Sequence, residues 1–170
     1  MKKFFKNNLP KPDDLKKYKA LGILGDSIFQ KQLWSINKYT LSRAVAIGLF
    51  WGWMPMFFQM IPAAFCAVYF RANLPLSVAG VWVSNPITMP PMMYLGYEFG
   101  NLVLGIDPLF DKFEASIDWL ISVFSLIWEP LLVGTMIIGI SSAIIGFFGI
   151  HLIWKIIAYK KLKRMQDNIK

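Results

Sequence analysis

The sequence predicts an all-α integral membrane protein in a single domain of 170 residues. Of these residues, 56% are hydrophobic, against roughly 45–50% in an average soluble protein. Two apolar arms, residues 44–70 and 72–97, are separated by one charge, Arg71, and a third apolar run covers residues 131–158. Such long, charge-poor sequence is typical of membrane helices. We therefore expect broken or re-entrant helical arms, one C-terminal transmembrane helix and amphipathic surface helices.

Both arms are interrupted near their middles by prolines and polar side chains. The first arm contains Pro55, Gln59 and Pro62, and the second contains Asn85, Pro86, Thr88, Pro90 and Pro91. Non-helical backbone in lipid is tolerated only where protein or a water-filled cavity satisfies its N–H and C=O groups. Interruptions in corresponding positions of two segments are typical of a membrane binding site. Each arm is either a kinked span or a re-entrant hairpin, because both need the same prolines.

The N-terminal segment, residues 1–43, is basic, and no signal peptide is expected because it lacks an uncharged apolar run. Residues 26–39 place apolar side chains among lysines at helical spacing. This pattern favours either an amphipathic helix on an anionic membrane surface or a solvated helix that caps the membrane domain. The basic side chains are spread out and no recognition fold accompanies them, so we expect no nucleic acid partner.

Three more segments follow this basic N-terminal segment, so the chain has four parts. Residues 44–106 form the membrane domain with both arms. Residues 107–129 are acidic and predict an amphipathic helix on the outer surface, which begins at Asp107-Pro108. Residues 130–170 predict a transmembrane helix with a basic tail.

The charge pattern orients the chain through the positive-inside rule. Both basic ends are expected in the cytoplasm and the acidic segment outside. Residues 131–158 cross once, so the two arms together must cross an odd number of times. One arm is then a hairpin and the other a span, or the arms cross three times in total. Arg71 favours the first arm as the hairpin, because its return would leave Arg71 on the cytoplasmic side.

The interruptions are the candidate binding site. We expect Gln59, Asn85 and Thr88 to converge near the membrane midplane and to present amides and a hydroxyl to a polar headgroup or small solute. Arg43 or Arg71 would supply a positive charge at the mouth, suited to phosphate. Alternatively, Asn85 closes a turn, Gln59 satisfies backbone freed by Pro62, and the arginines extend to lipid headgroups.

Several short elements occur together and in order across residues 30–105. They are Leu33-Trp34, Ser42-Arg43-Ala44, Arg71-Ala72-Asn73-Leu74-Pro75 and Trp82-Val83-Ser84-Asn85-Pro86-Ile87-Thr88. This pattern resembles the bacterial membrane-protein family called domain of unknown function 2062 (DUF2062). Family members often carry a histidine where this chain has Gln32. The resemblance implies a bacterial inner-membrane location without an established activity. Some members are joined to glycosyltransferase-like domains, which implies a link to envelope lipids or glycans.

No enzymatic activity, metal or other cofactor is expected. The sequence contains no metal-ligand spacing, glycine-rich phosphate loop or nucleophile elbow. We expect a transporter or a lipid- or solute-translocating protein that contacts anionic lipid headgroups. It would work as a homo-oligomer, because a chain of this length offers few spans. The alternative is a non-transporting scaffold or assembly factor that positions an envelope-biogenesis enzyme through its basic N-terminus and outer helix.

Overall fold

The computed structural model describes residues 30–56, 58–107 and 117–167, and all of its elements in these ranges are helical. In chain order they are the 3-10 helix η2 (Lys31–Trp34), α3 (Lys38–Trp53), α4 (Met60–Tyr69), α5 (Leu74–Gly80), the 3-10 helix η3 (Val81–Val83), α6 (Met89–Leu104) and α7 (Ile117–Asp167). The described ranges contain no strand, which confirms the all-α class.

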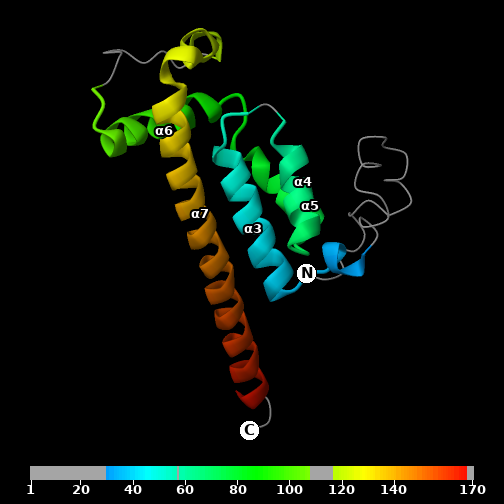
Figure 1. The fold of residues 1–170 in the computed structure, drawn as a ribbon. Helices are drawn as coiled ribbons and strands as arrows, with labels where there is room; N and C mark the ends of the chain where they lie inside the picture. The colour runs from blue at the N-terminus through cyan, green and yellow to red at the C-terminus, as the bar shows by residue number, and fades with distance from the viewer. Residues whose placement is uncertain (1–29, 57, 108–116, 168–170) are drawn as a thin grey trace.

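Helix α3 lies at the centre of the molecule, between α7 on one side and α4 and α5 on the other (Figure 1). The backbone N–H of Asn73 donates to the carbonyl of Thr40 at 3.0 Å, so the start of α5 lies beside the start of α3. Helix α7 runs antiparallel to α3, because the ring of His151 lies 5.9 Å from that of Tyr39 while Gly139 packs near Trp53. Helix α6 crosses the first half of α7.

The first arm is a helical hairpin. Helix α3 ends at Trp53, the chain reverses before Met60, and α4 returns along α3. Arg43 at the start of the arm donates from Nη1 to the carbonyl of Phe70 at its end, at 2.9 Å. The second arm takes a different path. Helices α5 and η3 rise beside α3, and α6 then leaves sideways across α7 (Figure 1).

The prolines of the arms lie in turns or begin helices. Pro55 and Pro86 lie in the two connecting turns. Pro62 is the third residue of α4, and Pro90 and Pro91 are the second and third residues of α6. The first backbone N–H groups of a helix have no intrahelical acceptor, so a proline there removes no hydrogen bond.

Two of the expected segment boundaries fall inside helices. Helix α3 begins at Lys38 rather than Ala44, because the Asn37 side chain caps it. Over the described part of the amphipathic helix expected at residues 26–39, the 3-10 helix η2 is followed by extended backbone at Ser35. Helix α7 continues through Pro130. A proline costs about 3 kcal/mol in a helix interior, and the buried contact with α6 at this turn offsets that cost. Asp107, at the expected start of the outer helix, is non-helical. Pro108 and most of the basic N-terminal segment lie outside the described residues.

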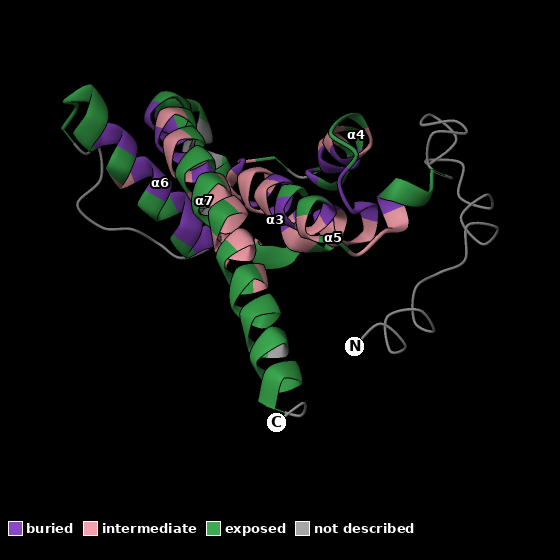
Figure 2. Cartoon of the chain, turned by 90° about the horizontal axis from the view of Figure 1, so that it is seen from below, coloured by how far each residue is buried: buried purple, intermediate pink, exposed green. Residues whose placement is uncertain are grey.

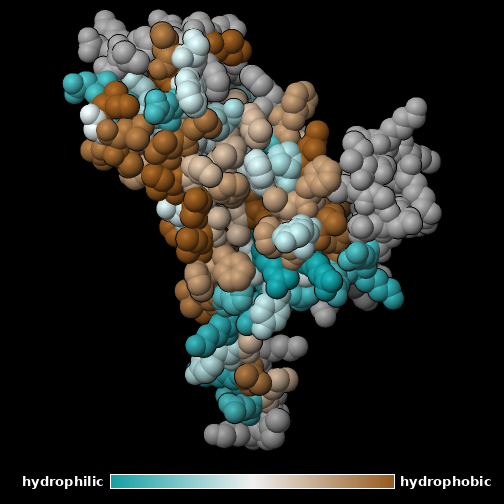
Figure 3. Space-filling model, viewed as in Figure 1, coloured by the Kyte–Doolittle hydropathy of each residue, from teal (hydrophilic) through white to brown (hydrophobic). Residues whose placement is uncertain are grey.

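Helix α7 is long and apolar enough to cross a membrane over Ser125–Asp167, and no other described helix meets that criterion. Only 22% of its most apolar window is buried, whereas the core helix of a soluble protein would be mostly covered. Figure 3 shows apolar surface over the upper part of the molecule and hydrophilic surface at its lower end. Figure 2 shows that the C-terminal part of α7 projects from the body and is exposed.

Glycines let the helices cross in backbone contact. A Cβ atom at Gly134 would overlap the carbonyl oxygen of Gly96, and one at Gly100 would overlap that of Pro130. A Cβ atom at Gly48 would lie 2.7 Å from the Cα of Gly80, so α3 and α5 approach in the same way. Small residues at helix contacts are typical of membrane bundles.

We predict that Gly134→Ala destabilises the protein by about 1–3 kcal/mol, the usual cost of overpacking, because the new methyl group displaces α6. Thermal unfolding in detergent, followed by circular dichroism, would measure this. Gly149→Ala is the matched control, since a Cβ atom there meets nothing within 4 Å and alanine is the better helix former. An unchanged unfolding temperature in Gly134→Ala would contradict the backbone contact of α6 with α7.

Candidate functional site

The interruptions of the two arms lie against each other. Gln59 is 6% exposed. Its Oε1 accepts a hydrogen bond from the Ser84 hydroxyl at 2.9 Å, and its Nε2 donates to the carbonyl of Met54. Met54 follows α3, Gln59 precedes α4 and Ser84 follows η3. One amide side chain therefore joins three helix ends.

Asn85 and Thr88 close the turn before α6. Asn85 Oδ1 accepts from the backbone N–H groups of Ile87 at 2.9 Å and Thr88 at 3.1 Å. Thr88 Oγ1 accepts from the Asn85 N–H at 2.9 Å and donates to the Val83 carbonyl at 2.7 Å. The oxygens of both side chains are therefore engaged by backbone. The Nδ2 group of Asn85 makes no hydrogen bond to the described residues, so it is available to a ligand.

A pocket of about 270 Å³ lies where the two interruptions meet. Its lining residues are Met56, Gln59, Met60, Val81, Trp82, Ser84, Asn85, Pro86 and Met89. The walls are mainly apolar, and the two amides and the Ser84 hydroxyl supply the polar groups. A few polar groups on apolar walls are typical of small-ligand sites. Thr88 does not line the pocket and acts on it only through the turn that it closes.

The level of this pocket along the molecule follows from the contacts between the hairpin and α7. A Cβ atom at Gly139 would lie 3.3 Å from the Phe50 carbonyl oxygen and from Trp53 Cβ, so the hairpin turn is level with Gly139. At ~1.5 Å per residue, Gly139 lies about 15 Å along the helix from Glu129 and about 24 Å from Lys155. These two residues bound the stretch of α7 without acidic or basic residues other than His151. The pocket is therefore near the middle of the apolar run.

Arg43 and Arg71 lie away from the pocket, at the opposite end of the hairpin. Arg43 is exposed and bound to the Phe70 carbonyl, and Arg71 is exposed where α4 ends. Ten residues of helix, about 15 Å, separate Arg43 from the end of α3. The structure therefore places neither arginine at the mouth of this pocket. The hairpin that brings Gln59 close to Ser84 also returns the chain, so that Arg71 lies level with Arg43.

The charged side chains separate along the molecule. Described lysines and arginines lie in η2 and the start of α3, at the α4–α5 junction and in the last part of α7. They are Lys31, Lys38, Arg43, Arg71, Lys155, Lys160, Lys163 and Arg164. The described acids Glu98, Asp107 and Glu129 lie with α6 and the first part of α7, and Asp167 is the exception. An apolar belt between a basic end and an acidic end matches the charge pattern of a membrane protein.

Asn85 caps the turn that leads into α6 with the same hydrogen bonds by which Asn37 caps α3. Asn37 Oδ1 accepts from the N–H groups of Tyr39 at 2.9 Å and Thr40 at 3.0 Å. Thr40 Oγ1 accepts from the Asn37 N–H at 3.2 Å and donates to the Ser35 carbonyl at 2.8 Å. These are the contacts of Asn85 and Thr88, found again forty-eight positions earlier.

The repeat extends beyond the caps. A tryptophan in a 3-10 helix precedes each asparagine, and two glycines four positions apart follow each threonine. The matched pairs are Trp34 and Trp82, Asn37 and Asn85, Thr40 and Thr88, Gly48 and Gly96, and Gly52 and Gly100. The signal is legible in the sequence as Trp-x-x-Asn-x-x-Thr-x7-Gly-x3-Gly, once the two arms are compared at a constant spacing. Internal repeats with interrupted helices are typical of transporters.

Comparison with known proteins gives one family. A family model described as "Uncharacterized protein conserved in bacteria (DUF2062)" matches residues 21–163, which confirms the resemblance noted in the sequence. No curated protein and no solved structure matches the chain.

Arg71 gives a test of local strain. Its φ is 52°, in the left-handed region, where its N–H donates to the Val68 carbonyl at 3.2 Å and that of Ala72 donates to Ala67 at 2.8 Å. This C-terminal motif usually has glycine at the left-handed residue. We predict that Arg71→Gly raises the free energy of unfolding by about 1 kcal/mol, measured by thermal unfolding in detergent. Arg71→Lys keeps the same backbone cost and should leave stability unchanged. Destabilisation by Arg71→Gly would mean that the arginine side chain contributes more than its backbone strain costs.

Proposed function

The chain belongs to the DUF2062 family of bacterial proteins, and we propose that it is a small inner-membrane protein that translocates the polar headgroup of a lipid. The observation that carries this proposal is the Gln59–Ser84 hydrogen bond, which joins the two interruptions beside a pocket midway along the apolar run of α7.

Three features support the membrane placement. Helix α7 has the length and composition of a span. Large side chains on its surface are exposed, among them Met136, Ile140, Ile144 and Phe148. Apart from Asp167, the described basic and acidic side chains lie at opposite ends of the molecule. On the positive-inside rule the basic end is cytoplasmic, and the first arm is a re-entrant hairpin that enters from that side and turns at mid-depth.

The location of the polar groups supports translocation. A polar group at membrane depth is costly unless it pairs within the protein or lines a cavity. Gln59 and Asn85 combine both conditions, because each satisfies freed backbone and also lines the pocket. Apolar walls around a few hydrogen-bonding groups suit a headgroup that moves while its acyl chains stay in lipid. One such pocket in a small chain makes a short pathway, so we propose that copies of the chain assemble to complete it.

We predict that the wild-type protein, reconstituted alone into liposomes, moves fluorescent phosphatidylglycerol between the leaflets. Bleaching of the fluorophore by external dithionite measures this. Asn85→Ala and Gln59→Leu should each reduce the rate at least tenfold while inserting normally, because each removes a polar group from the pocket.

Asn37→Ala is the matched control, since it removes the same kind of cap, worth about 1 kcal/mol, far from the pocket. It should retain the rate. Full activity in both pocket variants, or an equal loss in Asn37→Ala, would refute a translocation role for the pocket. An inactive wild-type protein that copurifies with an envelope enzyme would favour the scaffold alternative, which depends largely on residues outside the described ranges.

The orientation has its own test in intact cells. In a Cys66→Ala background we predict that a membrane-impermeant thiol reagent labels Asp107→Cys but neither Tyr69→Cys nor Met165→Cys. All three positions are exposed in the structure. Labelling of Tyr69→Cys would contradict the re-entrant hairpin, and labelling of Met165→Cys without Asp107→Cys would invert the orientation.

A further inference from the structure

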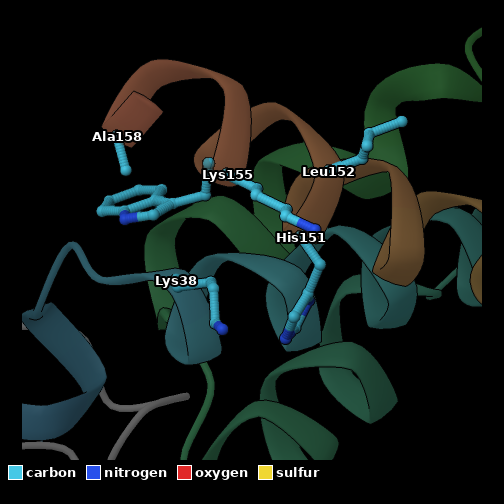
Figure 4. A pocket seen from close by; sticks show the side chains of 6 residues that line it. Lys38, His151, Leu152, Lys155 and Ala158 are labelled. Carbon is cyan, nitrogen blue, oxygen red and sulfur yellow. The ribbon is translucent and has the colours of Figure 1, made fainter. Parts of the chain in front are cut away.

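A second pocket lies at the basic end of the molecule, between the start of α3 and the end of α7. Its volume is about 470 Å³, and it is lined by Lys38, His151, Leu152, Trp154, Lys155 and Ala158. Figure 4 shows Lys38 reaching in from α3, while His151 and Lys155 come from α7. Two lysines and an imidazole thus share one pocket, and none of the lining residues is acidic.

The orientation of these side chains is restrained by aromatic packing. Lys38 Nζ lies 4.8 Å from the centre of the Tyr39 ring, and that ring meets His151 edge-on at 5.9 Å. His151 Nδ1 lies 3.1 Å from the Phe147 carbonyl oxygen. A carbonyl only accepts, so Nδ1 carries the hydrogen and Nε2 is the nitrogen that remains for other partners. Two ammonium groups around one pocket repel each other, and an anion between them removes that repulsion.

The pocket has an apolar side as well as a charged one. Leu152, Trp154 and Ala158 supply apolar wall next to the lysines. His151 and Lys155 stand where the apolar run of α7 gives way to its basic end. Tryptophan and lysine at such a boundary are typical of the headgroup level of a bilayer. A free phosphate would make no use of the apolar wall, whereas a phospholipid places a phosphate beside hydrocarbon.

We propose that this pocket binds the phosphate of an anionic phospholipid, held by Lys38 and Lys155 with His151 between the facing helices. The proposal takes only the membrane placement from the proposed function and does not depend on translocation. The internal repeat relates this pocket to the one at the hairpin turn. Lys38 and Pro86 occupy matching positions after the two caps, and each lines a pocket. The pocket beside the first cap is at the interface, and the pocket beside the second is at mid-depth.

The experiment is a titration of the purified full-length protein in neutral detergent, read by native mass spectrometry. Phosphatidylglycerol is compared with phosphatidylcholine of the same acyl chains. We expect the wild-type protein to prefer phosphatidylglycerol at least tenfold. Lys38→Gln and Lys155→Gln should each weaken phosphatidylglycerol binding roughly tenfold, through the loss of a charged hydrogen bond.

The control is the pair Lys160→Gln and Lys163→Gln, which removes two positive charges from α7 outside the pocket and should keep the preference. A wild-type protein without headgroup preference would overturn the proposal, as would an equal loss in the control pair. If 10 mM inorganic phosphate displaces the lipid completely, the pocket is a free-phosphate site and the lipid assignment fails.

A charge-preserving variant separates binding from folding. Lys38→Arg with Lys155→Arg keeps both charges, so it should retain helix content and the preference for phosphatidylglycerol. Loss of that preference with intact helix content would contradict binding by positive charge. The result is also independent of translocation. Asn85→Ala and Gln59→Leu leave this pocket intact, so failure of either proposal is recognisable without the other.

Discussion

Every helix that begins inside the apolar part of this protein leaves backbone N–H groups without an intrahelical partner. A buried N–H without a partner costs free energy comparable to a lost hydrogen bond, and apolar surroundings offer no such partner. The chain meets this constraint with amides. Asn37 and Asn73 each accept from the first turn of a helix, and Asn85 accepts from the turn before α6. Gln59 accepts from Ser84 and donates to the Met54 carbonyl. These side chains decide where the helices begin, and the hairpin and the central pocket follow from those positions.

The duplicated cap shows how one local structure can serve two places. Asn37–Thr40 and Asn85–Thr88 form the same hydrogen bonds, so the caps themselves do not distinguish the two pockets. The difference lies in what packs beside them. The first cap lies near the end of α7 with its basic side chains, and the second lies near Gln59 and Ser84 at the turn of the hairpin. The pocket at the basic end of the molecule and the pocket at the hairpin turn are therefore separate sites with the same kind of cap beside them.

Close helix crossings hold the two pockets at fixed levels along α7. Gly48 against Gly80 sets α3 beside α5, and Gly96, Gly100 and Gly134 set α6 across α7. Since α3 also packs along α7, the hairpin turn remains level with Gly139. Helix packing therefore sets the level of the central pocket along α7, because glycines let the helix backbones touch.

The sequence by itself determined the all-helical class, the family, and the positions at which the arms are interrupted, because proline, glycine and asparagine act on the backbone within a few residues. It also contained the repeated cap pattern. Only the tertiary structure decided that Gln59 meets Ser84, that Arg43 and Arg71 lie far from that contact, and that α7 continues through Pro130. Each of these depends on how distant segments pack: a hairpin reverses the chain, and α6 covers the proline turn. Local preferences set where helices can begin, whereas packing between segments far apart in sequence sets which side chains share a site.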